Sequence, residues 1–450
     1  MRTRGLLVGP LVGLLGLGLG LGLTVSLGCG GGTGHDGAGG PGGPGGGGDG
    51  GTSEASTGSS SSGGSGGGSS SGSGSSGSGS SGGDAGVSAG DAGGSSDGAA
   101  GDAAACSADT KTDAKNCGGC GHDCLGAACA DGLCAPEAVG NFGSITNVTP
   151  SFALDADNLY VAGDVISGQT AAHVIAAVPR TGGGAPVILS QTTTEQWRGE
   201  ALVVAGGRVF WSNGDHVGVL SVPTTAKNVA ATVVYDDPND PGPLVGLAVA
   251  GSTLYFVQDC GGLYEAPIPT GKGTLVSALG CNSLGLNRMA VDPAGTYVYL
   301  TDGGNAQVLT IATASGDENI VASSVSGPMG IAVDAAHVYW TVAGTCTGSG
   351  TTATCTGGEI RRATAPSGAS ALTFIDKIDS TGALGGLGQV TLDATTLYYS
   401  VYKGVTNTLY ERKLAGGPVV KLATLASFAV PDGDYVYYAG GGEGVSRVAR

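Results

Sequence analysis

One phrase recurs seven times between residues 152 and 438: an apolar run, a short turn that often holds Asp, and an apolar–aromatic pair. It is clearest at Gly330–Thr341, which reads Gly-Ile-Ala-Val-Asp-Ala-Ala-His-Val-Tyr-Trp-Thr. Its aromatic anchor recurs at intervals of 50, 45, 44, 40, 59 and 39 residues, at Tyr160, Phe210, Tyr255, Tyr299, Tyr339, Tyr398 and Tyr437. A strand-like repeat of about 40–50 residues is typical of β-propeller blades.

Each repeat contains enough apolar segments for four short strands. The phrase supplies two, and segments such as Leu409–Leu414 and Val419–Leu422, separated by the turn Gly416–Pro418, supply two more. A single four-stranded sheet leaves its faces and edges open, whereas a ring of sheets packs face against face and leaves only short edges. We therefore predict an all-β, seven-bladed propeller over residues 135–450, with six blades as the alternative.

The two ends of the predicted propeller complement each other. The last repeat stops after its third strand, at Gly444–Arg450. We predict that Glu137–Phe142, which precedes the first repeat, supplies the fourth strand of the last blade. The ring would then be closed by strands from both ends of the domain.

Four repeats carry an acid in the turn of the phrase, at Asp155, Asp292, Asp334 and Asp393. Asp is a common turn residue because its carboxylate accepts hydrogen bonds from nearby backbone N–H groups. We predict that these acids cap turns on the face opposite the long loops, and that their role is structural.

The segments Gly327–Asp334 and Val338–Thr341 resemble the NHL and YWTD propeller repeats. The resemblance implies the propeller fold. It does not imply one function, because both families include ligand-binding proteins and some relatives are enzymes.

Residues 1–28 have the features of a secretory signal peptide: two positive charges in Met1–Arg4, then an apolar stretch over Leu6–Leu27. The end of this stretch resembles a bacterial lipobox, with Ser26 at a position that usually holds Leu. The resemblance implies cleavage before Cys29 and lipidation of that residue. An uncleaved membrane helix is the alternative, because about 20 apolar residues can span a bilayer. We expect an exported lipoprotein at the outer membrane or cell surface.

Residues 29–105 are almost entirely Gly, Ser, Ala and Asp. Such a segment has too little apolar surface to offset the entropy lost on ordering, so we expect a disordered tether. The net charge of −17 argues against nucleic acid and anionic lipid surfaces as partners. The expected partners are a membrane, reached through the lipid anchor, and an envelope protein or glycan that binds a monomeric chain.

Residues 106–134 form a cysteine-rich module with six cysteines: Cys106, Cys117, Cys120, Cys124, Cys129 and Cys134. On an exported chain this density predicts three disulfides of open connectivity, which replace a core too small to form. Metal binding is the alternative, because Cys117, Cys120 and His122 have ligand-like spacing. The run Asn-Cys-Gly-x-Cys-Gly-x-x-Cys resembles the module of plant stigma-specific secreted proteins, a pattern also common in exported myxobacterial proteins. The resemblance implies an extracellular setting.

The propeller contains four further cysteines. Cys346 and Cys355 flank an insert that accounts for the interval of 59 residues, and we predict a disulfide between them. Cys260 and Cys281 lie in two connections that emerge on the same propeller face, so we predict a second disulfide. A reactive thiol is the alternative, but an even number of cysteines in an exported chain disfavours it.

We expect ligand binding on the loop face, where strand two joins strand three and each blade joins the next, since rigid scaffolds usually present function on loops. Trp197 lies among polar residues there and can stack on a sugar, anchor a partner or tuck under its own loop. Asp236, Asp237 and Asp240 form an acidic turn. Such acids can bind Ca²⁺, although Asp is also an ordinary turn residue, and we assign no cofactor.

The sequence favours a binding module over an enzyme. It contains five histidines at separate positions, with no Ser-His-Asp order, His-x-x-x-His pair or phosphate-binding glycine loop. A calcium-dependent, lactonase-like hydrolase is one alternative, because Glu200 and Asn287 resemble the acid and Asn positions that hold Ca²⁺ in the channel of propeller lactonases. A surface scaffold with no single ligand is the other.

Overall fold

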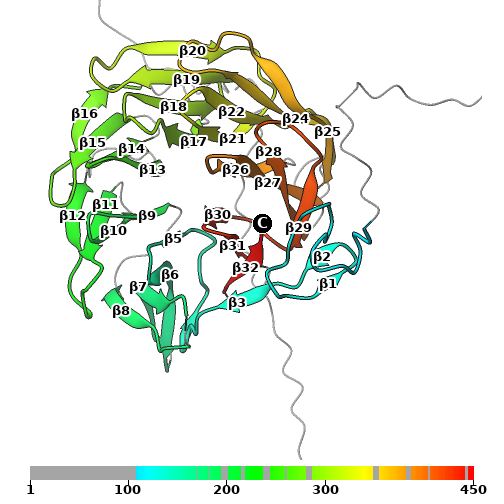
Figure 1. Ribbon diagram of the computed structural model, residues 1–450. Coiled ribbons are helices and arrows are strands. Elements are labelled where there is room, and N and C mark those ends of the chain that lie inside the picture. Colours follow the sequence, from blue (N-terminus) through cyan, green and yellow to red (C-terminus); the bar gives the residue numbers. More distant parts are fainter. Residues whose placement is uncertain are drawn as a thin grey trace, which may run out of the picture. The chain divides into compact units, whose positions relative to one another are not determined.

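The computed structural model describes residues 108–168, 170–181, 183–193, 201–213, 218–236, 244–258, 261–279, 286–347, 354–381, 387–403, 406–440 and 444–450. All regular elements in these ranges are β-strands, and none of these residues belongs to a helix that could cross a membrane. The strands form seven blades arranged in a ring (Figure 1). The predicted all-β, seven-bladed propeller is confirmed, and the six-bladed alternative is wrong. The predicted signal peptide, Cys29, the tether and Cys106 lie outside the described residues.

Each blade has four main strands, which we give from the inner strand to the outer one. The first four blades are β5 (Phe152–Leu154), β6 (Asn158–Ser167), β7 (Thr170–Pro179) and β8 (Val187–Thr192); β9 (Leu202–Ala205), β10 (Arg208–Asn213), β11 (Gly218–Pro223) and β12 (Thr232–Asp236); β13 (Leu244–Ala250), β14 (Thr253–Gln258), β15 (Gly262–Pro267) and β16 (Thr274–Ser277); and β17 (Leu286–Val291), β18 (Tyr297–Asp302), β19 (Gln307–Ala312) and β20 (Glu318–Ala322).

The last three blades are β21 (Pro328–Val333), β22 (His337–Val342), β24 (Thr354–Thr364) and β25 (Leu372–Thr381); β26 (Leu387–Leu392), β27 (Thr396–Lys403), β28 (Thr406–Lys413) and β29 (Val420–Thr424); and β30 (Ala429–Asp432), β31 (Tyr435–Ala439), β32 (Val445–Ala449) and β3 (Glu137–Val139). Two short strands add to this pattern: β4 (Ile145–Thr146) pairs with β6, and β23 (Thr345–Thr347) pairs with β24.

Strand β3 closes the ring, as the sequence predicted. It pairs antiparallel with β32, with Glu137 opposite Arg447 and Val139 opposite Val445. The Arg447 guanidinium lies 2.8 Å from the Glu137 carboxylate, and it also stacks 4.2 Å from the centre of the Tyr435 ring. Main-chain pairing and an ion pair therefore join the two ends of the domain.

The aromatic pair of the repeated phrase explains how the blades pack. Successive side chains of a strand point to opposite faces, so the anchor faces one neighbouring blade and the next residue faces the other. Tyr160 of blade 1 shares a cluster with Trp211 of blade 2, and Phe210 of blade 2 shares one with Phe256 of blade 3. In the described residues seven such clusters fill the seven interfaces between blades.

The turn acids have the capping role that the sequence predicted. The Asp393 carboxylate accepts hydrogen bonds from the backbone N–H groups of Thr395 and Thr396 and from the Tyr398 hydroxyl, at 2.8, 3.1 and 2.9 Å. Asp155 and Asp334 make the same three kinds of contact in their own blades. Asp292 caps two N–H groups. We call the side of the propeller that carries these acids the turn face.

Arginines join neighbouring blades on the turn face around the ring closure. Arg180 at the end of β7 contacts Asp432 and donates to the Tyr437 hydroxyl of blade 7 at 2.6 Å. Arg450 after β32 contacts Asp393 of blade 6 and lies 3.2 Å from the Tyr398 hydroxyl. Each arginine therefore reaches back to the Asp–Tyr pair of the preceding blade.

The cysteine-rich module contains β1 (Cys129–Ala130), β2 (Leu133–Cys134) and the disulfides Cys117–Cys129 and Cys124–Cys134. Cys120 is also disulfide-bonded. The Sγ atoms of Cys117, Cys124 and Cys129 lie within 4.8 Å of one another. Their disulfides leave them no thiolates to offer a metal ion, which favours the disulfide interpretation over the metal site.

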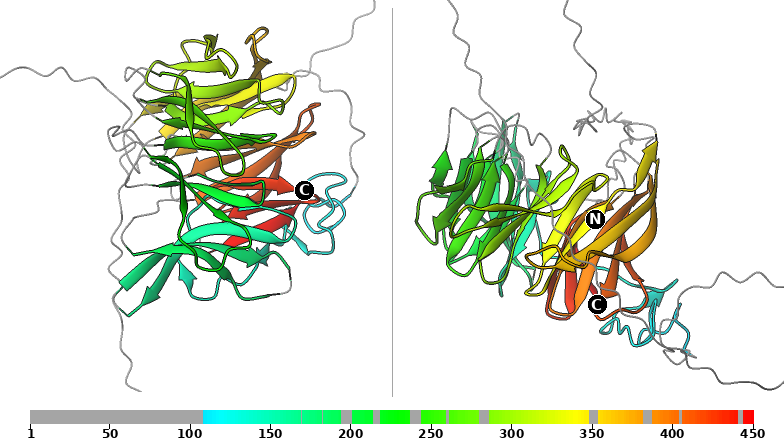
Figure 2. Two further views of the ribbon diagram at one scale, coloured as in Figure 1. Left: turned by 90° about the vertical axis from the view of Figure 1, so that its left-hand side faces the viewer. Right: turned by 90° about the horizontal axis from the view of Figure 1, so that it is seen from above.

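The module packs on the propeller, which the sequence did not predict. It lies beside β29 and β32 (Figure 1, Figure 2), and its buried cysteines share a cluster with Tyr398 and Tyr438 of blades 6 and 7. The His122 ring is buried, with Nδ1 2.5 Å from the Cys117 carbonyl oxygen and Nε2 3.1 Å from that of Ala449. His122 thus joins the module to β32, the strand with which β3 pairs.

Candidate functional site

Polar side chains occupy one position on the loop face in three consecutive blades. The second strands of blades 2, 3 and 4 end at Asn213, Gln258 and Asp302, three residues after their aromatic anchors. In the other blades the same position holds Gly163, Val342, Val401 and Gly440. We call Asn213, Gln258 and Asp302 the polar row, because the fold does not require polar residues at this position.

Gln258 is fully buried but only half satisfied. Its Oε1 accepts a hydrogen bond from the Tyr235 hydroxyl at 3.1 Å, while its Nε2 has no partner among the described residues. Turning the amide over would leave the oxygen unpaired instead. A buried polar group without a partner costs about 1–3 kcal/mol, so Gln258 is a poor choice for stability alone.

Asn213 has a similar unpaired atom in the adjacent blade. Its Oδ1 is buried and lacks a hydrogen-bond partner within the described ranges. Asn213 lies opposite Gly218, which lies opposite Asp236 on the outer strand of blade 2. Asp236, which the sequence singled out, therefore lies in the same cross-strand row as Asn213, and its neighbour Tyr235 bonds Gln258.

Asp302 occupies the same position in blade 4, and its hydrogen bonds are complete. Its carboxylate is 0% exposed and accepts bonds from the Asn305 backbone N–H at 3.0 Å, the Asn305 amide at 2.8 Å and the Gln307 amide at 3.1 Å. Asn305 lies in the tight connection between β18 and β19, and Gln307 is the first residue of β19. Asp302 therefore has a structural explanation, which Asn213 and Gln258 lack.

Aromatic rings fix the polar group that holds Gln258. Tyr235 packs against Tyr264 and Phe256 of blade 3, with ring centres 4.5 and 5.1 Å apart, and Phe256 stacks on Tyr264 at 5.4 Å. These contacts set the position of the Tyr235 hydroxyl. The Gln258 amide is consequently held in place by a rigid interface between blades 2 and 3.

Other buried side-chain atoms also lack a hydrogen-bond partner in the described part of the chain, at Ser190, Thr310, Trp340, Glu411 and Arg412. Burial raises the pKa of Glu411, and the nearby charges of Lys413 and His122 oppose that rise. Asn213 and Gln258 differ from this group because they occupy one position in adjacent blades and lie next to a predicted site residue. Aligning the repeats on their anchors would have revealed them in the sequence.

Several predicted site residues fall outside the described part of the chain: Trp197, Glu200, Asp237, Asp240, Cys260 and Cys281. The backbone of Asn287 belongs to β17. Cys355 is buried and disulfide-bonded, and the register of β23 and β24 places Cys346 directly opposite. That register supports the predicted Cys346–Cys355 pair, while the Cys260–Cys281 pair stays a prediction.

No protein-family model matches the sequence, and no curated protein matches it. Several solved structures resemble it in fold. YCF48 from Cyanidioschyzon merolae is 13% identical, with 70% of this chain and 99% of that one covered and a TM-score of 0.48. The WD40 domain of Toxoplasma gondii coronin is 10% identical over 70% and 84% of the two chains, with a TM-score of 0.45. BamB from Moraxella catarrhalis is 10% identical over 67% and 82%, with a TM-score of 0.40. Similarities at this level concern the fold and identify no function.

Proposed function

We propose that the chain is an exported, lipid-anchored protein of the cell envelope whose propeller binds a glycan at the loop face over blades 2 and 3. An envelope protein is the competing ligand. The anchor is Cys29, and the tether carries the propeller away from the membrane as a monomeric binding module.

The Nε2 donor of Gln258, which has no partner among the described residues, is the observation that carries this proposal. In the next blade, the Oδ1 acceptor of Asn213 likewise has no described partner. A sugar hydroxyl both donates and accepts, so hydroxyl groups match these atoms. The Asp236 carboxylate adds a further acceptor on the outer strand of blade 2, in line with Asn213 across the sheet. Ligand sites commonly use a few well-placed polar groups of this kind.

Access to Gln258 requires a local opening of the loop face. Its side chain is fully buried, so a sugar hydroxyl reaches the amide only when the surrounding contacts separate. Burial of the bound hydroxyl would then exclude water and strengthen its hydrogen bonds.

The disulfides support the proposed location. Cys117–Cys129 and Cys124–Cys134 belong to a class of bond that forms and persists in oxidising compartments. Mass spectrometry of the N-terminus tests the anchor: the mature wild-type protein should begin at a lipidated Cys29, and Cys29→Ala should carry no lipid and keep its first 28 residues. A wild-type protein that keeps residues 1–28, or that begins at an unmodified Cys29, would contradict the lipoprotein proposal.

A binding experiment tests the ligand. The full-length protein in detergent micelles would be applied to an array of envelope glycans, as wild type and as Gln258→Met. A matched control is Gln191→Met, which replaces an exposed Gln on β8. We expect Gln258→Met to weaken glycan binding by about tenfold and the control to leave it unchanged. Capture of only a protein, dependent on Gln258, would change the ligand class, and equal binding by all three proteins would contradict the site.

A further inference from the structure

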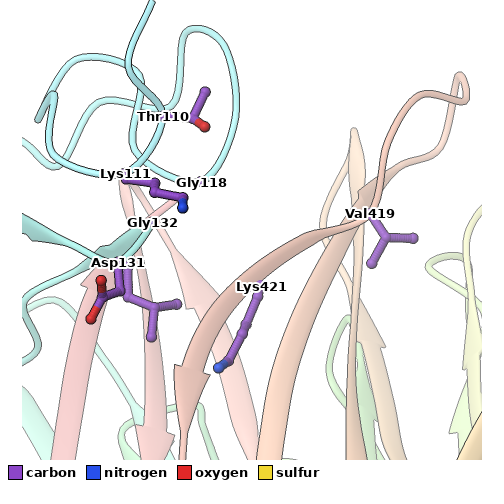
Figure 3. A pocket seen from close by; sticks show the side chains of 8 residues that line it. Thr110, Lys111, Gly118, Asp131, Gly132, Val419 and Lys421 are labelled. Atoms are coloured by element: carbon purple, nitrogen blue, oxygen red, sulfur yellow. The ribbon is translucent and has the colours of Figure 1, made fainter.

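A second concave site lies where the cysteine-rich module meets the outer edge of blade 6. Its volume is about 330 Å³, and it is lined by Thr110, Lys111, Gly118, Asp131, Gly132 and Leu133 of the module and by Val419 and Lys421 at strand β29 (Figure 3). The volume falls at the lower end of the range for small-ligand pockets. Nothing in the polar row contributes to it.

Glycines bring the module wall of this pocket close to the propeller. A side chain at Gly118, where φ is +72°, would place its Cβ 2.5 Å from the Gly132 carbonyl oxygen and 3.6 Å from the Val420 side chain. A Cβ on Gly119 would lie 3.4 Å from Val420. The neighbouring amides are already used, since Gly118 N–H donates to the Thr110 oxygen and Gly132 N–H to that of Lys111. The wall is therefore a fixed backbone surface, and recognition falls to the side chains.

The charged side chains of the pocket come from both of its sides. Lys111 and Lys421 have no ion-pair partner among the described residues, whereas Lys115 lies 2.6 Å from Asp123 and Lys413 lies 3.9 Å from Glu411. Asp131 is the acid of the lining. Two ammonium groups and one carboxylate give the pocket a net positive charge in a chain whose net charge is −17.

We infer that this pocket binds an acidic sugar, with the carboxylate or phosphate group between Lys111 and Lys421. Ammonium groups form charge-assisted hydrogen bonds with oxyanions. Asp131 accepts a hydrogen bond from a ring hydroxyl of the same ligand. A bare inorganic anion has no ring hydroxyl and does not make this contact. Leu133 and Val419 contact the apolar edge of the ring. The module thus supplies half of a binding site, in addition to its role at the ring closure.

Calorimetric titration of the full-length protein in micelles tests this inference. The probes are glucuronate, glucose 6-phosphate, inorganic phosphate and, as the neutral control, glucose. We expect saturable binding of glucuronate or glucose 6-phosphate and no binding of glucose. The tighter of the two acidic sugars shows whether the pocket prefers a carboxylate or a phosphate. Added salt should weaken binding, because the contacts are ionic and partly exposed.

Three variants assign the binding to this pocket. Lys111→Gln and Lys421→Gln should each weaken it about tenfold, while Lys115→Gln, in the same module, should leave it unchanged. Gln258→Met should also leave it unchanged, which separates this site from the loop-face site. Binding of glucose as tight as that of glucuronate, saturation by inorganic phosphate alone, or equal binding by wild type and both pocket variants would overturn the inference.

Discussion

The turn face and the loop face of this propeller both carry polar residues at recurring positions, but those residues differ in what they contact. On the turn face, Asp155, Asp334 and Asp393 each accept two backbone N–H bonds and one tyrosine hydroxyl. On the loop face, Asn213 and Gln258 each keep a buried atom without a partner in the described chain. Recurrence alone therefore does not separate structural residues from functional ones, whereas a recurring position combined with incomplete hydrogen bonding singles out Asn213 and Gln258.

The turn face also differs from blade to blade, and its residues change together. At the ring closure, Arg450 reaches the Asp393–Tyr398 pair of the preceding blade. Blade 2 has Ala205 at the position of the turn acid and Phe210 as its anchor. Ile268 of blade 3, at the position of the arginine, packs against the cluster that contains Phe210. Loss of the acid thus accompanies loss of the hydroxyl and of the arginine. The acid, the tyrosine hydroxyl and the arginine are replaced together by apolar groups, so none of the three remains without its partners.

The largest effect is expected from Asp393→Ala. The substitution removes the acceptor for two N–H groups, the Tyr398 hydroxyl and Arg450, and it leaves the arginine without its carboxylate partner. Breaking such a partly buried pair should lower the free energy of unfolding by about 3–5 kcal/mol. Asp157→Ala, at an exposed neighbour of the Asp155 turn, serves as the control and should change it by less than about 0.5 kcal/mol. Denaturant titration measures both, and a similar small change in the two variants would contradict the capping role.

Acid should act on the turn face first. Burial alone would raise the pKa of Asp393, but the N–H group and hydroxyl of Thr395, the Tyr398 hydroxyl and Arg450 lower it overall below the ordinary value of 3.8. The folded pKa lies below the unfolded one, so this stabilisation is fully present above about pH 4 and is lost as the pH falls through the folded pKa. The melting temperature of wild type should therefore fall more steeply below pH 4 than that of Asp393→Asn. Parallel curves would show that Asp393 is not responsible.

A smaller effect should follow from building the polar contact into blade 2. Phe210→Tyr alone places a hydroxyl against Ile268 and should cost about 1–2 kcal/mol. Adding Ala205→Asp supplies the acceptor at the same spacing of five residues as Asp334 and Tyr339. The double variant should recover about 1 kcal/mol relative to the sum of the single changes. A double-mutant cycle by thermal unfolding measures this coupling, and strictly additive effects would show that spacing is not sufficient.

Much of the fold was predictable because it repeats. The period of the anchors gave the number of blades, the incomplete last repeat led to β3, and the recurrence of Asp at one turn position led to the caps. The docking of the module was not predictable, since His122 meets the carbonyl group of Ala449, 327 residues later, and no periodicity links them. The site was predicted in part: Asp236 was named, and an alignment of the repeats on their anchors would also have found the position of Gln258. Only the structure shows that Tyr235 of another blade bonds the Gln258 oxygen and that the nitrogen has no described partner.

The most direct test compares Gln258→Met with Asp302→Leu in thermal unfolding of the full-length protein. Both remove a fully buried polar side chain from the same position of adjacent blades. Asp302→Leu should lower the melting temperature by several degrees, because it removes the carboxylate that accepts three hydrogen bonds from Asn305 and Gln307. Gln258→Met should change it much less. It removes one acceptor, that of the Tyr235 hydroxyl, together with a buried donor that has no partner among the described residues. Equal destabilisation by both variants would mean that Gln258 serves the fold, and would contradict the assignment of the loop face to ligand binding.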